Sequence, residues 1–235
     1  MINSPDNSYL SANKKFWEKG YPAPNVDHHT FRFFGRILKP QFNLPRNNEK
    51  LLDFGCGSGA AVNFFYKNKF DSQGVDISVT DLSNAKVQYP HIRDKFSLCN
   101  PDPKLQPIYG TETSYSVITA FQSLYYFCKS DFEIVINKLN DQLVPGGIFF
   151  ATMMGESSKE YYNNSISTDD EWLRKVDFKN SRLNITDYYM FFVKNEDDLL
   201  KRFNIFKPIH IGYYSAKLRS DEGDGFHYTF CGMKR

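Results

Sequence analysis

The run LLDFGCGSGA at residues 51–60 constrains the fold of this chain more than any other feature. Its three glycines, Gly55, Gly57 and Gly59, follow a short apolar segment and precede a helical pattern at residues 60–70. Glycine permits a tight turn and lets bare backbone approach a ligand closely. The run therefore predicts a buried strand at 50–54, a ligand-binding turn and a helix, in that order.

Strand and helix patterns alternate along most of the chain. Further strands are predicted at 72–78, 95–100, 115–121 and 147–154, and helical patterns follow three of the five strands. This alternation predicts an α/β fold with a doubly wound, mostly parallel sheet and helices on both faces. The last two predicted strands, at 207–216 and 226–233, have no strong helix between them, which favours an antiparallel hairpin edge. We expect seven strands, with the ligand outside the carboxyl ends of the first ones.

Composition excludes several classes of protein. The chain has 235 residues, 41% of them hydrophobic, which suits one globular domain. With 29 basic and 27 acidic residues the net charge is +2, and no basic run predicts a nucleic-acid partner. No apolar run approaches the ~20 residues that cross a bilayer, and the polar N-terminus lacks a signal-peptide core. The four cysteines show no CxxC spacing, so we expect a cytoplasmic protein with reduced cysteines and no metal site.

Two ligands compete for the glycine turn. Gly55, Gly57 and Ala60 satisfy the G-x-G-x-x-G/A pattern of dinucleotide sites, and Asp76 lies where a ribose-binding acid is expected. That pattern alone is weak. Asp53, two residues before Gly55, shifts the balance, because a carboxylate there repels a pyrophosphate but attracts an amino group or a sulfonium. A third glycine in the turn and a Pro-Gly-Gly turn at 145–147 also favour S-adenosylmethionine.

Four segments resemble, in order, the motifs of class I S-adenosylmethionine-dependent methyltransferases. They are 51–59 (LLDFGCGSG), 74–78 (GVDIS), 115–118 (YSVI) with 124–127 (LYYF), and 143–147 (LVPGG). Ser116 departs from the pattern, because the family usually has Asp there. The resemblance implies a Rossmann-like methyltransferase fold with S-adenosylmethionine as cofactor. It also implies an N-terminal helical lid at 1–42 and a methyltransferase domain at 43–235, with an insertion at about 155–193 that covers the acceptor.

The resemblance assigns residues to parts of the cofactor. The methionine part is expected on Asp53, Gly55, Cys56, Gly57 and Gly59. Asp76 is expected to accept both ribose hydroxyls through its two oxygens, or else it caps the following helix. The adenine and the methyl group are expected near Ile77, Asn100, Pro101, Ala120 and Phe121. Asn100 alternatively makes only a turn before Pro101, and Trp17 belongs to a segment loosely similar to a lid of small-molecule methyltransferases.

An N-terminal helix is predicted over residues 26–38, capped by Asp27 and ended by Pro40. Its inward face is expected to consist of Phe31, Phe34 and Leu38. His28, Arg32 and Arg36 form the opposite stripe at spacings of four residues. That stripe is expected to hold the cofactor carboxylate or an anionic substrate through arginine, or else it is a solvated face. Two more helix starts are predicted at Ser78 and at Ser130, the latter in a capping box with Glu133.

The expected reaction is methyl transfer to a small polar or anionic acceptor, such as a sugar, a sugar nucleotide or a phosphorylated glycan precursor. The candidate catalytic residues are His28, His29 and Tyr125. Tyr126 and the aromatic residues of 155–193 are further candidates for the acceptor side. Two alternatives remain open: methylation of a protein or RNA, and a non-catalytic S-adenosylmethionine-binding partner subunit. We expect a monomer or a homodimer.

Overall fold

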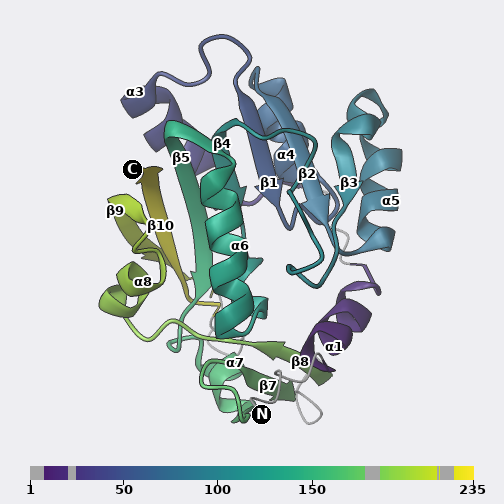
Figure 1. Cartoon of the computed structure of the whole chain (residues 1–235), viewed down its shortest axis with the longest axis vertical. Coiled ribbons are helices and arrows are strands. Elements are labelled where there is room, and N and C mark those ends of the chain that lie inside the picture. Colours follow the sequence, from purple (N-terminus) through teal and green to yellow (C-terminus); the bar gives the residue numbers. More distant parts are fainter. Residues whose placement is uncertain (1–7, 21–24, 178–185, 216, 218–224) are drawn as a thin grey trace.

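The computed structural model describes residues 8–20, 25–177, 186–215, 217 and 225–235, and its main element is a seven-stranded sheet (Figure 1). The strands are β1 (Lys50–Phe54), β2 (Asp71–Asp76), β3 (Phe96–Leu98), β4 (Tyr115–Ala120), β5 (Leu143–Met154), β9 (Phe206–Tyr214) and β10 (His227–Lys234). They lie in the order β3-β2-β1-β4-β5-β10-β9. β10 runs antiparallel to both of its neighbours, β5 and β9, and the other neighbouring pairs are parallel. The predicted fold and the hairpin at its edge are confirmed, and β10 itself lies one strand in from that edge.

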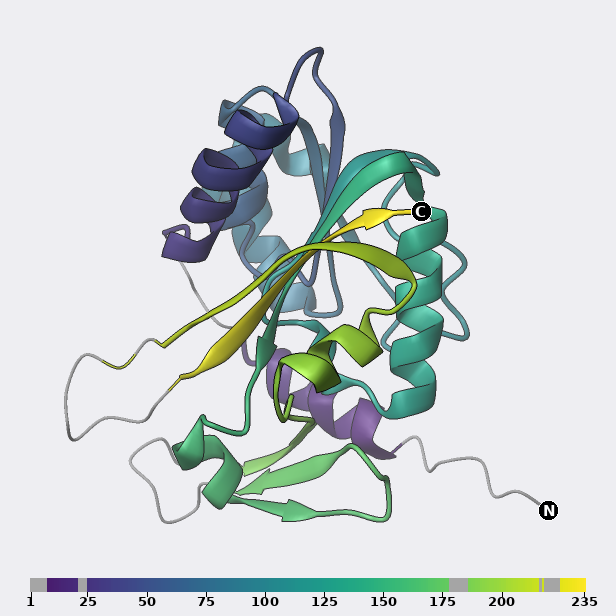
Figure 2. The same cartoon turned by 90° about the vertical axis from the view of Figure 1, so that its left-hand side faces the viewer.

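Helices cover both faces of this sheet (Figure 2). One face carries α2 (His28–Phe33), the π-helical turn η1 (Phe34–Leu38), α3 (Lys39–Phe42), α4 (Ala60–Lys67) and α5 (Val79–Gln88). The other face carries α6 (Lys129–Asp141) and α8 (Glu196–Arg202). Two short 3-10 turns, η2 (Pro90–Lys95) and η3 (Leu124–Tyr126), complete the connections. Each face has its own buried core, one including Phe33, Phe65 and Phe150 and the other Phe132, Phe149 and Phe203.

The helix predicted over residues 26–38 differs from its prediction in extent and phase. It begins at His28 and continues through Pro40 to Phe42, and the Arg36 carbonyl accepts a hydrogen bond from Gln41 Nε2 at 3.1 Å. Phe31, which was expected inside, is 51% exposed, whereas Phe33 is buried together with Leu38. The π-helical turn explains the change, because its i→i+5 hydrogen bonds place residues five apart on one face.

The serine caps give one confirmed prediction and one wrong one. Ser78 begins α5, and its hydroxyl accepts a hydrogen bond from the Asp81 N–H at 3.1 Å. Ser130 does not begin α6, because Cys128 occupies the N-cap position and makes no side-chain capping bond. Asp27 occupies the N-cap position of α2, but its carboxylate also makes no capping bond.

The segment after β5 forms a small second layer at the end of the sheet where β1, β4 and β5 terminate (Figure 1). It contains α7 (Lys159–Asn163) and a three-stranded sheet of β6 (Ser165–Ser167), β7 (Arg174–Asp177) and β8 (Thr186–Met190). Part of the predicted insertion, residues 178–185, lies outside the described residues, as do 1–7 and 21–24 of the predicted lid. The N-terminal helix α1 (Ser8–Trp17) packs against β8, not against the large sheet.

Two buried polar side chains fix α1 in this position. Asn13 Nδ2 donates to the carbonyl oxygens of Tyr126 and Tyr189, at 2.9 and 3.0 Å, and Asn13 Oδ1 accepts from the Tyr189 N–H at 2.7 Å. Tyr9 donates a hydrogen bond to the buried carboxylate of Asp131 in α6. Helix α1 thus joins the second layer, whereas α2 and α3 belong to the large sheet.

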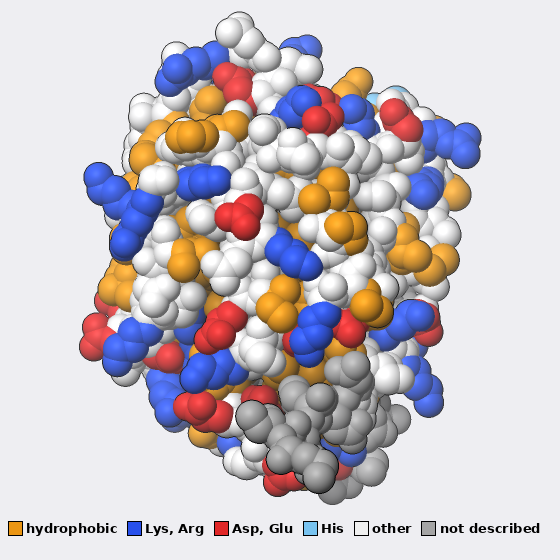
Figure 3. Space-filling model, in the orientation of Figure 1, with side chains coloured by type: hydrophobic (Ala, Val, Ile, Leu, Met, Phe, Trp, Pro, Cys, Tyr) orange, Lys and Arg blue, Asp and Glu red, His pale blue; other side chains and the backbone are white. Residues whose placement is uncertain are grey.

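Charged side chains of both signs are interspersed over the face seen in Figure 3. None of the helices within the described ranges is long and apolar enough to cross a membrane. The four cysteines are buried, and none of them forms a disulfide in the structure.

Candidate active site

The glycine turn lies between β1 and α4 at the carboxyl end of the sheet. Gly55, Gly57 and Gly59 all have positive φ, at 74°, 51° and 83°, a conformation that glycine adopts without strain. The N–H groups of Gly55 and Cys56 both donate to the Val75 carbonyl, at 2.8 and 3.0 Å, and tie the turn to β2. A methyl group on Gly55 would lie 2.4 Å from Ser123 Cβ, so the turn also closes tightly on the loop after β4.

Asp76, at the end of β2, braces this turn through its carboxylate. Oδ2 accepts from the Gly57 N–H and Oδ1 from the Ser78 N–H, both at 2.8 Å. Burial raises the pKa of Asp76, and the two backbone hydrogen bonds oppose that rise. Because each carboxylate oxygen accepts more than one hydrogen bond, both retain capacity for a ligand that carries two hydroxyls.

Asp53, near the end of β1, is a nearly fully buried carboxylate at 2% exposure. Its Oδ1 accepts a hydrogen bond from the Thr119 hydroxyl at 2.7 Å. Burial raises the pKa of Asp53 to about 7, with a further contribution from the negative charge of Asp76. No lysine or arginine is among the described residues that line the adjoining cavity, so a cationic ligand would relieve this repulsion.

One cavity of about 560 Å³ runs from this turn to the second layer. We call the part beside Asp53, Gly55–Gly57, Asp76, Ile77 and Cys99 the glycine-turn half. The part beside α1, η3, β8 and the β9–β10 hairpin is the aromatic half. The volume lies within the range of roughly 300–1,000 Å³ typical of small-molecule sites.

Four rings from three separate elements form a wall of the aromatic half. Phe16 and Trp17 come from α1, Tyr126 from η3 and Tyr188 from β8. Phe16 stacks on Tyr188 with ring centroids 4.4 Å apart, and Trp17 meets Tyr126 edge to face at 5.2 Å. We call these four residues the aromatic wall.

Other elements, among them α2, β9 and β10, bring a second group of rings to the cavity. The centroid of the His29 ring lies 4.8 Å from that of Phe121 and 5.3 Å from that of Tyr214. The Tyr214 and His227 rings are stacked with centroids 5.1 Å apart. Burial lowers the pKa of His29 to about 3 and that of His227 to about 4, so both rings are neutral at pH 7. His227 Nδ1 donates to the Gly225 carbonyl at 2.8 Å, which leaves Nε2 to accept from the Tyr125 hydroxyl at 3.4 Å.

Comparison with known proteins decides which family carries this arrangement. A family model described as a methyltransferase domain matches residues 26–208, which is well over half of the chain. The chain belongs to the methyltransferase domain family. This confirms the family and enzyme class predicted from the sequence, and it agrees with S-adenosylmethionine as the cofactor.

Solved structures similar to this methyltransferase share its fold at low sequence identity. An S-adenosylmethionine-dependent methyltransferase from Methanosarcina mazei has a TM-score of 0.65 and 15% identity, over 82% of this chain and 95% of that one. Phosphoethanolamine N-methyltransferase 2 from Haemonchus contortus, solved with S-adenosyl-L-methionine, has a TM-score of 0.58 and 14% identity, over 99% of this chain and 58% of that one.

One curated relative carries a different name. The chain is 27% identical over 160 residues to 4-diphosphocytidyl-2-C-methyl-D-erythritol kinase of Bacteroides fragilis. The match covers 63% of this chain and spans only 57% of the kinase. That partial likeness carries no activity over to this methyltransferase.

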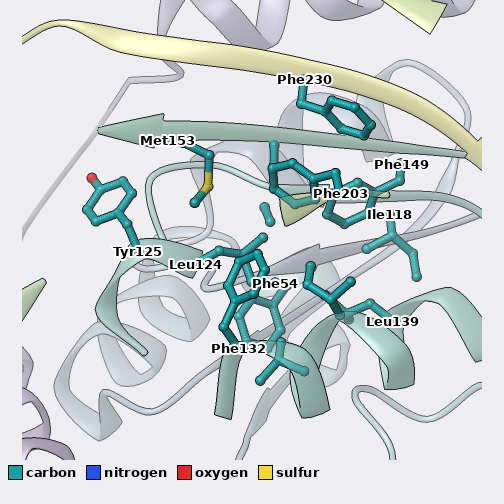
Figure 4. Close-up of a cluster of buried hydrophobic side chains, with 14 of the residues drawn as sticks. Phe54, Ile118, Leu124, Tyr125, Phe132, Leu139, Phe149, Met153, Phe203 and Phe230 are labelled. Atoms are coloured by element: carbon teal, nitrogen blue, oxygen red, sulfur yellow. The ribbon is translucent and has the colours of Figure 1, made fainter. Parts of the chain in front are cut away.

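The structure brings most of the predicted site residues of the methyltransferase into one cavity. The lining contains Trp17, His29, Asp53, Gly55, Cys56, Gly57, Asp76, Ile77, Pro101, Phe121 and Tyr125. Figure 4 shows Tyr125 at the margin of the buried core, with its hydroxyl directed away from Phe132 and Leu139. Their roles toward a cofactor or acceptor stay predictions.

Five predicted site residues lie outside the described lining. His28 and Arg32 are exposed on α2 and Arg36 is exposed on η1, so the stripe is a solvated helix face. Only one of the two adjacent histidines turns inward, because successive helical positions differ by about 100°. His28 and Arg32 therefore do not line this cavity, which gives their predicted site roles no support.

The other three residues have structural surroundings that explain them. Asn100 is exposed, and its Oδ1 accepts from the Asp102 N–H at 2.9 Å, which is the turn that the sequence allowed as an alternative. Gly59 is the N-cap of α4 and packs against Phe96 and Ala85. Ala120 is fully buried in the core at the end of β4.

Sequence reasoning missed several residues that the fold brings to the cavity or to Asp53. Asn13, Gln122, Ser123 and Tyr214 line the cavity, and Thr119 holds Asp53. Ser123 donates from its hydroxyl to the Phe54 carbonyl at 2.8 Å and pins the β4 loop to β1. Gln122 and Ser123 had a usable signal, because they follow a strand end that the methyltransferase pattern already marked.

Proposed function

We propose that this methyltransferase transfers the methyl group of S-adenosylmethionine, held in the glycine-turn half, to a small molecule held in the aromatic half. The observation that carries the proposal is one cavity that contains both the buried carboxylate of Asp53, which a cationic ligand would stabilise, and the aromatic half. Methyl transfer from a sulfonium needs an in-line approach of the acceptor, so donor and acceptor must share one enclosed space.

The side chains of the glycine-turn half fit the chemistry of the donor. The Asp53 carboxylate matches the amino group of the methionine part, and the two oxygens of Asp76 match the ribose hydroxyls. The apolar side chains of Ile77 and Cys99 line the same half and suit the adenine. Bound S-adenosylmethionine supplies the electrophilic methyl group, and these residues supply affinity and alignment.

The acceptor remains a prediction at the level of its class. The absence of lysine and arginine from the described lining gives little support to the anionic members of the predicted set. Protein or RNA methylation gains no support from the face seen in Figure 3, where basic and acidic side chains are interspersed. A cavity that reaches both halves argues against a non-catalytic subunit. Monomer or homodimer remains open.

Calorimetric titration of S-adenosylmethionine into wild-type protein and an Asp76→Ala variant tests the donor site. We expect at least tenfold weaker binding in the variant, about 1.4 kcal/mol. Circular dichroism checks that the variant is folded. Equal affinity in the two folded proteins would remove Asp76 from the ribose site.

Labelled S-adenosylmethionine incubated with fractionated cell metabolites, and separately with protein and RNA fractions, tests the acceptor class. Transfer to the small-molecule fraction supports the proposal. Transfer confined to the protein or RNA fraction would contradict it.

A further inference from the structure

The aromatic wall presents both ring faces and ring edges to the cavity. Phe16 and Tyr188 are stacked with an angle of 27° between their planes, whereas Trp17 is nearly perpendicular to Phe16 and to Tyr126, at 87° and 76°. Aromatic rings attract one another in offset-stacked and edge-to-face geometries. A wall with both orientations therefore suits a flat ring.

The tyrosine and histidine side chains around this wall are electrically neutral at pH 7. One acidic residue lies beside them in the lining, Asp27, whose carboxylate is 3.9 Å from His29 Nε2 and whose side chain is 67% exposed. Burial raises the pKa values of the Tyr126 and Tyr188 hydroxyls and lowers those of His29 and His227. No described lining residue is a lysine or arginine that could pair with an anion. Placing an anion in such a chamber carries a desolvation cost that no basic side chain of the described lining offsets. A cation is also disfavoured, because the methyl-bearing sulfonium must lie close to the acceptor.

Several polar side chains of the aromatic half already have partners within the protein. Asn13 bonds to backbone groups of Tyr126 and Tyr189, and Gln122 Nε2 donates to the Tyr214 hydroxyl at 3.0 Å. His227 is occupied by Gly225 and Tyr125. A sugar carries many hydroxyls that each need a partner when buried, and these residues offer few.

We propose that the aromatic wall binds a flat, uncharged ring of the methyl acceptor, and that the acceptor is an uncharged aromatic compound, not a sugar or a phosphorylated molecule. This inference rests on the proposed function, because it takes the aromatic half to be the acceptor site. It makes the four wall residues the determinants of acceptor class.

Binding of five small probes tests the class without requiring the natural acceptor. Phenol, cyclohexanol, methyl glucoside, benzoate and benzylamine are titrated separately against protein saturated with S-adenosylmethionine, which keeps the sulfonium charge in place, and their affinities are measured by ligand-observed NMR. We expect phenol to bind at least tenfold more tightly than benzoate and methyl glucoside, and at least threefold more tightly than cyclohexanol and benzylamine. Benzoate or benzylamine binding as tightly as phenol would overturn neutrality, and methyl glucoside or cyclohexanol doing so would overturn the flat ring.

Variants place the probe on the wall. Trp17→Leu and Tyr126→Leu are expected to weaken phenol binding at least fivefold, whereas Tyr126→Phe, which keeps the ring, retains it. Tyr213→Leu is the matched control, because Tyr213 is 69% exposed and outside the described lining. Unchanged phenol affinity in a folded Trp17→Leu protein would overturn the assignment.

The affinity for S-adenosylmethionine separates this inference from the function on which it rests. It is expected to remain within threefold of wild type in the Tyr126 variants. Failure of wild-type protein to bind S-adenosylmethionine would count against the donor site itself, whereas intact binding with the wrong probe preference would overturn only the acceptor class.

Discussion

The two halves of the cavity are assembled in different ways. In the glycine-turn half, Asp76 accepts from the Gly57 N–H, a partner 19 residues away, and from Ser78, its near neighbour. In the aromatic half, Asn13 reaches partners 113 and 176 residues away. One half is thus built around a strand–turn–helix unit that is supported by Thr119 and Ser123 from β4 and the loop after it, whereas the other exists only when distant segments have packed. The donor site can remain constant while the acceptor site changes.

The largest expected effect comes from breaking the local unit at Gly55. Gly55→Ala combines a strained positive φ with a methyl group 2.4 Å from Ser123 Cβ. We expect a loss of about 3 kcal/mol or more in the free energy of unfolding and at least a hundredfold loss of S-adenosylmethionine affinity. Denaturant titration and calorimetry measure the two effects.

Gly146→Ala is the matched control for that substitution. Gly146 has a similar φ of 72°, but a Cβ there would meet no atom within 4 Å. We expect only the backbone cost of about 1–2 kcal/mol and unchanged cofactor affinity. Equal losses of affinity in the two variants would refute the close approach as the cause.

The next largest effect tests the tertiary half. Asn13→Ala removes three hydrogen bonds between α1, Tyr126 and Tyr189 and leaves their backbone groups without a partner, at a cost of about 2–3 kcal/mol. We expect faster amide hydrogen exchange at residues 8–17 and weaker phenol binding, with exchange at residues 50–57 unchanged. Asn137→Ala, on an exposed position of α6, is the control. Equal acceleration of exchange in both segments would contradict the independence of the two halves.

A smaller effect concerns pH and Asp53. The pKa of this carboxyl is raised to about 7, so the group is mostly protonated at pH 6 and mostly charged at pH 8. Only the charged form attracts an amino group, so S-adenosylmethionine affinity is expected to rise about tenfold from pH 6 to pH 8. Before cofactor binds, the same raised pKa makes this group's contribution to stability fall as pH rises from the ordinary aspartate pKa of 3.8 to about 7.

Asp53→Asn provides the check on this pH dependence. We expect the variant to bind S-adenosylmethionine weakly and with nearly equal affinity at both pH values in calorimetry. A tenfold rise retained in the variant would assign the titration to another group.

Substitutions outside both halves of the cavity are expected to leave ligand affinity unchanged. The double variant Arg32→Ala, Arg36→Ala changes an exposed helix face, so cofactor and phenol affinities should stay within twofold of wild type. A fivefold or larger loss of either affinity would bring the stripe back to the site.

Structural features were predicted correctly from the sequence where they depend on residues close together in the chain. The strand at 50–54 and the Ser78 cap were predicted correctly because an apolar run and a capping serine act within a few residues. The same logic failed at Ser130. The N-cap of α6 is Cys128, which is buried in a cluster with Tyr9 and Leu10, so long-range packing set where this helix begins. At Asn100 the local sequence left two interpretations open, because a turn and a ligand contact favour the same residue type, and the structure shows the turn.

The amino-acid sequence by itself determined the strand–turn–helix unit, its three left-handed glycines and the two carboxylates that favour the donor, because each depends on neighbours along the chain or on the next strand. Only the tertiary structure decided which of His28 and His29 faces inward, that α1 joins β8, and that four rings meet in one wall. Those features depend on helix phase and on contacts between distant segments, which no local pattern of residues encodes.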